Sequence, residues 1–311
     1  MKAIRIHSYG DLDTLRFEEA PMPQPGPADV RIRVHAAAVN PVDWKIREGY
    51  LSAMIPYPMP LTLGWDVSGV VEHVGSEVTH LAVGDAVFSR PDITRDGTYA
   101  EYAVMRAAEV AAKPETLSHN EAAAVPLAGL TAWQGLFDHG QLKKGERVLI
   151  HAGAGGVGSF AVQFAKWAGA HVIATGSAPS EALIRNLGAD EFVDYRSQRF
   201  EEILDKVDVV LDTIGGDTQV RSIPLLKAGG RLISMVATPD AEALVDAKAT
   251  GSLFMVQPSS EGLTQIAGLI DAGTVEVLID SVFPLAEVRA AHEKSQTGRA
   301  KGKIVLEVVP G

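Results

Sequence analysis

Three glycines near the middle of the sequence have the spacing of a dinucleotide-binding turn. Gly153, Gly155 and Gly158 form G-x-G-x-x-G in the stretch VLIHAGAGGVGSFAVQFAKW, where an apolar strand pattern leads into a helical one. The first glycine permits a tight turn, the second lets the backbone approach a pyrophosphate, and the third lets helix and strand pack closely. The helix would begin at Val157, directly after Gly156, with its free N–H groups facing the anion. The pattern predicts a dinucleotide coenzyme, and the alternative is a turn needed only for packing.

The end of the second predicted strand indicates which coenzyme this is. NAD sites usually carry an Asp or Glu there that bonds the ribose 2′-hydroxyl, but this sequence has Thr175-Gly176-Ser177. A carboxylate would repel a 2′-phosphate, whereas Ser177 offers a hydrogen-bond donor. Tyr195 and Arg196, at the end of the third strand, are candidate further donors. These residues favour NADPH, and the alternative is that Ser177 only starts a solvated loop.

Alternating strands and helices must position these residues. After LSHNEAAAVPLAGLTAWQGLF, apolar strand-like segments alternate with helical ones, which indicates βαβ units and a parallel sheet. The predicted strands are 147–152, 171–176, 191–196, 207–214, 231–236 and 252–256. The predicted helices include 157–169 and 181–187, and in the first of these Phe160, Phe164 and Trp167 share one face.

The N-terminal part of the chain has a different pattern of short strands separated by Gly and Pro. The stretch VRIRVHAAAV places Val30, Ile32 and Val34 on one face and polar residues on the other, as in a half-buried strand. VSGVVEHVGSEV and DAVFSR are similar, so we expect an antiparallel β unit. The C-terminal residues return to this pattern with a helix near LAEVRAAHEKSQ and the strand GKIVLEVV. We therefore expect the C-terminus to fold back onto the first domain.

The composition excludes several classes of function. The formal net charge of −11 disfavours binding to nucleic acid and to anionic membranes. The sequence contains no cysteine, which excludes disulfides, thiolate nucleophiles and zinc–thiolate sites. No apolar run approaches the roughly 20 residues that span a bilayer, and the start, MKAIRIHSYG, resembles neither a signal peptide nor a transit peptide. We expect a cytoplasmic protein whose partner is a small molecule.

The sequence resembles the medium-chain dehydrogenase/reductase superfamily, in its zinc-independent quinone oxidoreductase branch. The resemblance rests on the order of AAAVNPVDWKIREG, PLTLGWDVSGVV, VGDAVFSR, GTYAEYAV, AAAVPLAGLTAWQGLF, AGAGGVG and GRAKGKIVLEV. It implies an α/β fold with a GroES-like antiparallel β domain and a Rossmann domain built on a doubly wound parallel sheet. The GroES-like catalytic domain is expected at 1–122, completed by 286–311, and the NADP-binding Rossmann domain at 123–285.

This sequence departs from the zinc-dependent relatives at both ligand motifs. Those relatives carry Cys near the stretch that corresponds to residues 40–43, and Gly-His-Glu where this chain has Gly-Trp-Asp at 64–66. The histidines show no H-x-x-x-H spacing, and we interpret His73 and His80 as surface or core residues. We therefore predict that the protein holds no metal.

Without zinc to polarise a carbonyl, the acceptor must already be electron-poor, as quinones and α,β-unsaturated carbonyl compounds are. Hydride addition leaves an enolate-like oxygen, and one well-placed donor to such an oxygen contributes roughly 2.7–4 kcal/mol. The resemblance places Lys45 near the nicotinamide ribose or the substrate, as a candidate donor; the alternative is a solvated lysine. Asn40 faces the active site in relatives, although it also suits a local turn with Asp43. Tyr99 is a candidate wall or proton donor, or a packing residue.

The resemblance also assigns positions around the coenzyme. Thr131 corresponds to a residue that approaches the nicotinamide amide, while Ile214 and Val236 lie in segments that border the adenosine and nicotinamide halves. Lys303 is a candidate for contact with a coenzyme phosphate or carboxamide, and the alternative is a solvated cluster with Arg299 and Lys301. The segment GSLFMV resembles the edge strand that joins family dimers, so a homodimer is expected unless the chain itself covers that edge.

These observations predict an oxidoreductase that transfers a hydride from NADPH to quinones or α,β-unsaturated carbonyl compounds. An enoyl-thioester reductase of the same fold is a second possibility, but it calls for a basic groove that this acidic sequence does not indicate. A third possibility is an NADPH-binding structural or sensor protein without turnover.

Overall fold

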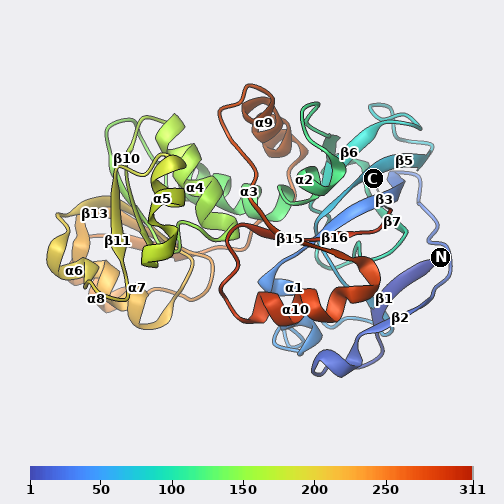
Figure 1. The fold of residues 1–311 in the computed structure, drawn as a ribbon, viewed down its shortest axis with the longest axis horizontal. Helices are drawn as coiled ribbons and strands as arrows, with labels where there is room; N and C mark the ends of the chain where they lie inside the picture. The colour runs from blue at the N-terminus through green and yellow to red at the C-terminus, as the bar shows by residue number, and fades with distance from the viewer. Residues whose placement is uncertain (310–311) are drawn as a thin grey trace. The chain divides into compact units, whose positions relative to one another are not determined.

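The computed structural model describes residues 1–309, which divide into two compact units. The first unit combines Met1–Leu127 with the chain from Gln257 onward, and the second contains Ala128–Val256 (Figure 1). Residues 257–285, which the sequence analysis assigned to the Rossmann domain, therefore lie in the first unit.

The reason is that two elements of this segment pack on the first unit. Strand β15 (Ile279–Pro284) pairs in parallel with β16 (Lys303–Glu307). Helix α9 (Ser260–Asp271) packs on β8 (Val110–Ala112). At the end of α9, the Asp271 carboxylate accepts a hydrogen bond of 2.8 Å from the Thr116 hydroxyl.

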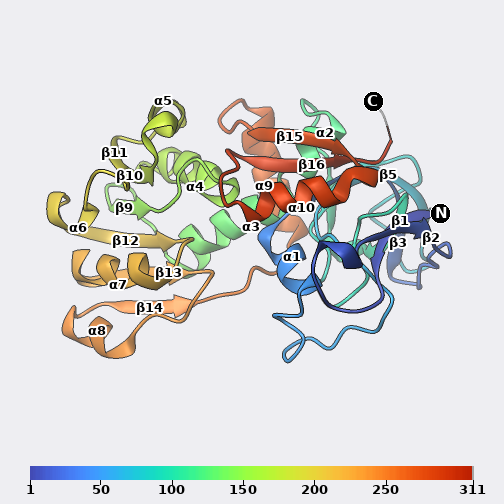
Figure 2. The ribbon, with the colours of Figure 1, turned by 60° about the horizontal axis from the view of Figure 1, so that its bottom comes forward.

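The second unit is built on the parallel sheet that the sequence predicts. Its six strands are arranged in the order β11-β10-β9-β12-β13-β14, and every pairing is parallel. They are β9 (Arg147–Ile150), β10 (His171–Gly176), β11 (Glu191–Asp194), β12 (Val207–Asp212), β13 (Leu226–Ser234) and β14 (Thr250–Leu253). Figure 2 shows them side by side, with β14 at one edge. This is the doubly wound order of a dinucleotide-binding fold.

Helices connect these strands and cover the sheet. They are α4 (Gly156–Trp167), α5 (Glu181–Asn186), α6 (Phe200–Ile203), α7 (Gly216–Ser222) and α8 (Ala241–Asp246), with a π-helical turn at Gln134–His139. The strands are apolar on both sides, as Val148, Leu149 and Ile150 of β9 illustrate, because both faces of a parallel sheet are buried.

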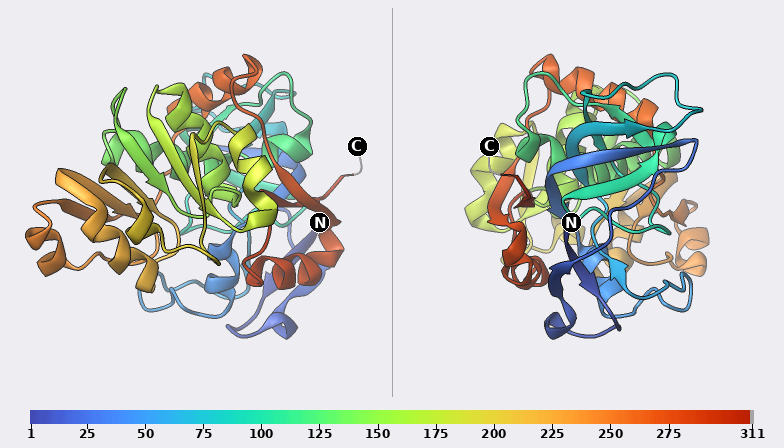
Figure 3. Two further views of the ribbon diagram at one scale, coloured as in Figure 1. Left: turned by 60° about the vertical axis from the view of Figure 1, so that its left-hand side comes forward. Right: turned by 90° about the vertical axis from the view of Figure 1, so that its right-hand side faces the viewer.

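The first unit contains a seven-stranded sheet in the order β15-β16-β3-β5-β6-β8, with β7 also paired to β3. Its other strands are β3 (Asp29–Val39), β5 (Val67–Val74), β6 (Ala86–Ser89) and β7 (Tyr102–Arg106). All pairings are antiparallel except that of β15 with β16. Because β16 pairs with β3, the expected return of the C-terminus is confirmed, and Figure 3 shows the red C-terminal strand against blue N-terminal ones.

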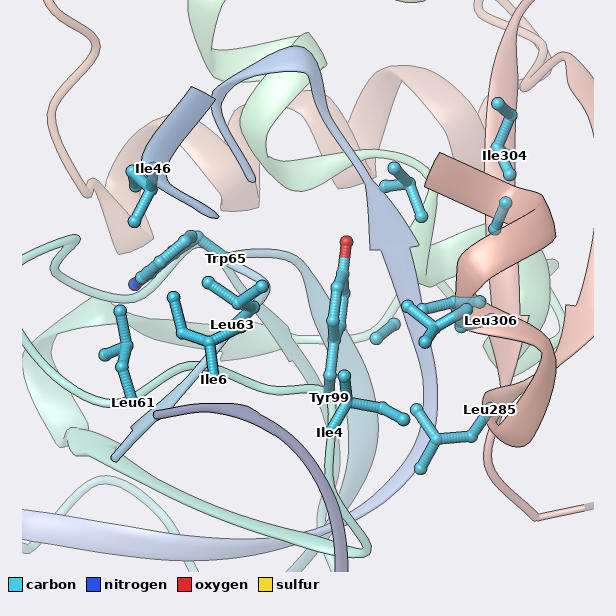
Figure 4. Close-up of a cluster of buried hydrophobic side chains, with 14 of the residues drawn as sticks. Ile4, Ile6, Ile46, Leu61, Leu63, Trp65, Tyr99, Leu285, Ile304 and Leu306 are labelled. Atoms are coloured by element: carbon cyan, nitrogen blue, oxygen red, sulfur yellow. The ribbon is translucent and has the colours of Figure 1, made fainter. Parts of the chain in front are cut away.

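A smaller sheet and three helices complete this unit. Strand β1 (Lys2–Ile6) lies between β2 (Arg16–Glu19) and β4 (Leu61–Thr62). The helices are α1 (Pro41–Arg47), α2 (His119–Ala123) and α10 (Val288–Gln296), and α3 (Pro126–Trp133) crosses the boundary between the units. A cluster of buried apolar side chains joins these elements, including Ile4, Ile6, Ile46, Leu61, Leu63, Trp65, Leu285, Ile304 and Leu306 (Figure 4). No helix within residues 1–309 has the length and apolar character to span a membrane.

Candidate active site

The glycine turn joins β9 to α4 as predicted, and its third glycine has the expected role. A Cβ atom on Gly158 would lie 2.1 Å from the carbonyl oxygen of Ala152, so only glycine allows this approach of helix to strand. The residue with a positive φ is not Gly153 but Ala152, at 53°. Gly153 is restricted instead by β10, because its Cβ would lie 2.9 Å from that of Ala174. The predicted strand–turn–helix is confirmed, and the residue in the left-handed conformation lies one position before Gly153.

The N-terminus of α4 has the features of an anion site. Gly155 is the N-cap residue and has no side chain to accept from the first amides of the helix. The first helical residues, Gly156 and Val157, are half-buried, and they also offer no side-chain hydrogen-bond acceptor. The first N–H groups of a helix need an outside partner and lie at the positive end of its dipole. The residues present therefore fit a pyrophosphate at this turn.

The ends of β10 and β11 bring together the residues predicted around the 2′-position. Gly176 is the register partner of Asp194, and the amide of Tyr195 donates to the Gly176 carbonyl at 3.1 Å. Ser177 is half-buried, while Tyr195 is 57% exposed and carries the Arg196 guanidinium 5.7 Å from its ring centre. The three predicted donors thus follow two neighbouring strands.

The same place holds a carboxylate that the sequence analysis overlooked. The carboxylate of Asp194, the last residue of β11, accepts hydrogen bonds from the Ser197 hydroxyl at 2.8 Å and the Arg196 amide at 3.1 Å. These bonds hold the pKa of Asp194 below its usual range. Asp194 does not follow β10 in the sequence but ends the adjacent strand, so only the sheet order places it beside Gly176.

Ile214 and Val236 follow β12 and β13 and are 53% and 38% exposed. They lie at neighbouring strand ends, because a Cβ on Gly215 would be 3.0 Å from a methyl of Val236. The Asp212 carboxylate connects these two strand ends, because it accepts hydrogen bonds from the Gly215 backbone amide at 2.8 Å and from Ser234 Oγ at 2.9 Å. Asp212 is not among the predicted site residues, although an acid at the end of an apolar strand is a visible signal in the sequence.

His151 fixes the other side of the same edge. Its Nε2 lies 2.8 Å from Ser222 Oγ, and its Nδ1 lies 3.2 Å from Thr175 Oγ1. The ring is 1% exposed, and burial lowers the pKa of His151 to about 4. The imidazole is therefore neutral at pH 7 and acts as a link between β9, β10 and α7.

In the first unit, Lys303 belongs to a buried polar network. Its ammonium pairs with Asp66 Oδ2 at 3.0 Å and also bonds Asn40 Oδ1, while Asn40 Nδ2 donates to the same Asp66 oxygen at 2.8 Å. Lys303 is 4% exposed, so the alternative of a solvated lysine is wrong. The residues of this network come from the N-cap of α1, from β16 and from the segment before β5, far apart in the sequence.

Asp43 and Tyr99 adjoin this network. The Tyr99 side chain is fully buried, and its hydroxyl donates to Asp43 Oδ2 at 2.6 Å. The backbone N–H of Asn40 donates to the same oxygen at 2.7 Å. Figure 4 shows the Tyr99 hydroxyl directed away from the surrounding aliphatic side chains. Burial raises the pKa of Asp43 to about 7, although the Tyr99 bond opposes this change. These contacts favour the packing role for Tyr99 and the predicted turn role for Asn40, which is the N-cap of α1.

Two further predicted residues lie on helices. Lys45 is on α1, half-buried, with its ammonium 5.6 Å from the ring centre of Trp44. It is therefore neither a fully solvated lysine nor part of the Asp66 network. Thr131 is on α3 in the second unit and is 4% exposed.

The residues that replace the zinc ligands do not fit a metal. Trp65 has no ligating atom, and the oxygens of Asn40 and Asp66 are bonded to the Lys303 ammonium, which repels a cation. Among the described residues, no group of three or more His, Asp or Glu side chains has the arrangement of a metal site.

Two families match the sequence. Residues 26–115 match the alcohol dehydrogenase GroES-like domain, and residues 187–306 match the zinc-binding dehydrogenase family. Among curated relatives, NAD(P)H oxidoreductase RTN4IP1, mitochondrial, of Danio rerio is 35% identical over 99% of this chain and 92% of its own. The 2-methylene-furan-3-one reductase of Solanum lycopersicum is 37% identical over 100% of this chain and 80% of its own.

Solved structures of oxidoreductases also match this chain over nearly its whole length. The quinone oxidoreductase from Coxiella burnetii has a TM-score of 0.93 and 35% identity, covering 99% of both chains. The Escherichia coli quinone oxidoreductase complexed with NADPH has a TM-score of 0.90 and 29% identity, covering 99% of this chain and 100% of its own. The whole chain, with both of its units, is thus matched by proteins of one kind.

Proposed function

The chain belongs to the zinc-independent quinone oxidoreductase branch of the medium-chain dehydrogenase/reductase superfamily, and on this premise we propose that it reduces quinones and α,β-unsaturated carbonyl compounds with NADPH. The observation that carries the proposal is the Lys303–Asp66–Asn40 network, in which Asn40 and Asp66 belong to the two stretches that carry ligand motifs in zinc-dependent relatives. A site that cannot take a Lewis acid there does not polarise an ordinary ketone, so its acceptor must already be electrophilic.

NADPH, when bound, supplies a hydride from nicotinamide C4. We propose that the amides at the start of α4, from Gly155 to Gly158, hold its pyrophosphate. Thr131 approaches the carboxamide, and Ile214 and Val236 border the rest of the coenzyme. The start of α4, Ile214 and Val236 follow strands β9, β12 and β13 at the carboxyl edge of the parallel sheet, which supports their part of this assignment.

The preference for NADPH over NADH depends on the pocket after β10. Ser177, Tyr195 and Arg196 supply donors and a positive charge for a 2′-phosphate. Asp194 opposes them, although its oxygens already accept bonds from Ser197 and Arg196. We expect a lower KM for NADPH than for NADH and a loss of this preference in Arg196→Ala. A lower KM for NADH in the unaltered enzyme would contradict the assignment.

We propose that the first unit stabilises the oxygen of the reduced acceptor. Lys45 is the candidate donor, because its ammonium lies on α1 beside Trp44 and is outside the Asp66 ion pair. Asn40 and Lys303 hold the local structure through Asp66 and are positioning residues. With Tyr99 buried against Asp43, solvent rather than this hydroxyl delivers the proton.

We also propose a homodimer through β14. This strand is the edge of its sheet, and Leu253 at its end is 47% exposed, so the edge needs a partner. Light scattering should give twice the chain mass, and Leu253→Lys should shift it toward the monomer. A cytoplasmic location is proposed from the absence of cysteine, although the Danio rerio relative is named as mitochondrial.

A screen of acceptors tests the activity. Oxidation of NADPH, followed at 340 nm, should be steady with 1,4-benzoquinone and with an alkenal, and absent with saturated ketones. Binding of NADPH without oxidation by any acceptor would instead support the non-catalytic alternative.

A further inference from the structure

Arg90 is a buried arginine to which the proposed chemistry gives no role. It directly follows β6 and is 2% exposed. Within residues 1–309, its Nε is buried without a hydrogen-bond partner, and no hydrogen bond or ion pair to protein is found for its Nη atoms. Arg47 provides a contrast, since its buried guanidinium donates to the Gly10 carbonyl at 3.2 Å and contacts His292 Nδ1 at 3.3 Å.

An unpaired guanidinium inside a protein is an unusual feature. Arginine stays charged in proteins, and a buried charge is retained when it is paired or hydrogen-bonded. Burial here lowers the pKa of Arg90, in the direction expected for a charge removed from water. Because an unpaired buried charge destabilises the folded protein, its presence here indicates a ligand that pairs with it.

The carboxylates that stabilise this charge from nearby are engaged with other cations. They are Asp66, Asp92 and Glu109. Asp66 pairs with Lys303 at 3.0 Å, and Arg106 Nη1 pairs with Asp92 at 2.6 Å and with Glu109 at 2.9 Å. None of them closes a salt bridge with the guanidinium, so it remains available to an outside anion.

A second unpartnered donor lies close by. Within the described part of the chain, the buried indole Nε1 of Trp65 has no hydrogen-bond partner. The Trp65 ring centre is 6.1 Å from that of Tyr57, whose hydroxyl donates to the Ile93 carbonyl at 2.9 Å. Burial raises the pKa of Tyr57, and the nearby Arg90 opposes this rise. Tyr57 is thus a common neighbour of two donors that lack acceptors, and both adjoin Asp66 in the first unit.

We propose that Arg90 binds a carboxylate on the acceptor, so that the enzyme's preferred acceptors are enones or quinones that carry an anionic substituent. This inference rests on the proposed function and specifies its substrate class. The planar guanidinium matches a carboxylate through paired N–H groups. The acceptor is the source of the anion because the coenzyme phosphates belong to the glycine turn and the pocket after β10 of the second unit.

A matched pair of acceptors tests this selectivity. We use trans-4-oxo-2-pentenoate and its methyl ester, which share the enone and differ in the negative charge. The unaltered enzyme should have the higher kcat/KM with the carboxylate. Arg90→Gln should lower the ratio of the two kcat/KM values by about tenfold to hundredfold, the usual effect of a charge-assisted hydrogen bond. Arg90→Lys should retain part of the preference.

Arg16→Gln is the matched control, because Arg16 is an exposed arginine of the same unit. It removes the same charge and should leave the ratio at the unaltered value. An equal ratio in the unaltered enzyme and Arg90→Gln would overturn the proposal, as solvent alone would then satisfy the guanidinium. A rise in the Kd for NADPH of tenfold or more in Arg90→Gln would also overturn it, because the anion would belong to the coenzyme.

A binding measurement separates this proposal from the proposed function. The saturated analogue 4-oxopentanoate should raise the melting temperature of the unaltered protein and not that of Arg90→Gln, whether or not turnover occurs. If neither enone is reduced but this difference is seen, the activity is wrong and the anion site stands. If both enones are reduced and the difference is missing, the anion site is wrong.

Discussion

Buried polar side chains hold the candidate functional residues in place within each unit. In the first unit Lys303, Asp66 and Asn40 satisfy one another, and in the second Asp212 and His151 tie the strand ends together. Most of these bonds join residues that are distant in the sequence. Single positions could therefore be selected from motifs, but their partners could not, because partnership depends on sheet order and register.

The Lys303–Asp66 pair should behave as a buried ion pair. Lys303→Met leaves the Asp66 charge buried without its cation, and we expect a loss of about 3–5 kcal/mol in the free energy of unfolding. Lys303→Met combined with Asp66→Asn removes both charges and should recover part of this loss. Urea denaturation of the two single variants and the double variant measures the coupling. A loss below about 0.5 kcal/mol in Lys303→Met would show that the pair is solvated.

His151 should make stability depend on pH. Its pKa is lowered from the ordinary 6.5 to about 4 in the folded protein, so the unfolded chain takes up a proton first as the pH falls. Its contribution is present above pH 6.5 and is lost between pH 6.5 and about 4, by about 3 kcal/mol in total.

In His151→Gln this titration is absent. The variant should be less stable than the unaltered protein at pH 7, because the bonds to Ser222 and Thr175 are weakened. Between pH 7 and 4.5 it should lose less stability than the unaltered protein. Identical slopes of unfolding free energy against pH would show that His151 is protonated equally in both states.

At the scale of elements, the hydrophobic pattern predicted the bounds and the buried faces of strands correctly where it followed a regular repeat. Strand β10 has the predicted bounds of 171–176, and Val30, Ile32 and Val34 of β3 are buried as the alternation requires. The pattern predicted the wrong bounds where the length of a strand depends on the strand that pairs with it. The apolar stretch 252–256 predicted a strand, but β14 ends at Leu253 because its pairing with β13 ends at Ser234.

The turn between β9 and α4 should depend on Gly158 more than on its other glycines. Gly158→Ala places a methyl 2.1 Å from the Ala152 carbonyl, so helix and strand must separate. We expect a loss of about 1–3 kcal/mol in stability and a weaker affinity for NADPH, measured by fluorescence titration.

Gly268→Ala is the matched control for that variant. Gly268 lies within α9, and no described atom outside its chain neighbours and the backbone of its own helix lies within 4 Å of the Cβ position. Alanine should therefore raise stability by about 0.5–1 kcal/mol through its higher helix propensity. If both glycine variants behaved alike, the close approach of α4 to β9 would not be a determinant of the site.

At the scale of the whole molecule, the resemblance in the sequence predicted two domains of the right kinds. Their content differs from the prediction at 257–285, because β15 pairs with β16 and α9 packs on β8, both in the first unit. Alternation in the sequence predicts which face of a strand is buried but not which strand pairs with it. The unit to which residues 257–285 belong could therefore be assigned only from the structure. The two units therefore contribute different features: the parallel sheet has the order of a dinucleotide-binding fold, and the antiparallel unit holds the buried Lys303–Asp66–Asn40 network.

The most direct test of this account compares one enone with its saturated ketone in enzyme treated with a metal chelator. NADPH oxidation with trans-3-hexen-2-one should persist after chelation, and 2-hexanone should give no measurable rate. Loss of the enone activity on chelation with recovery on adding zinc, or comparable rates for both compounds, would contradict it.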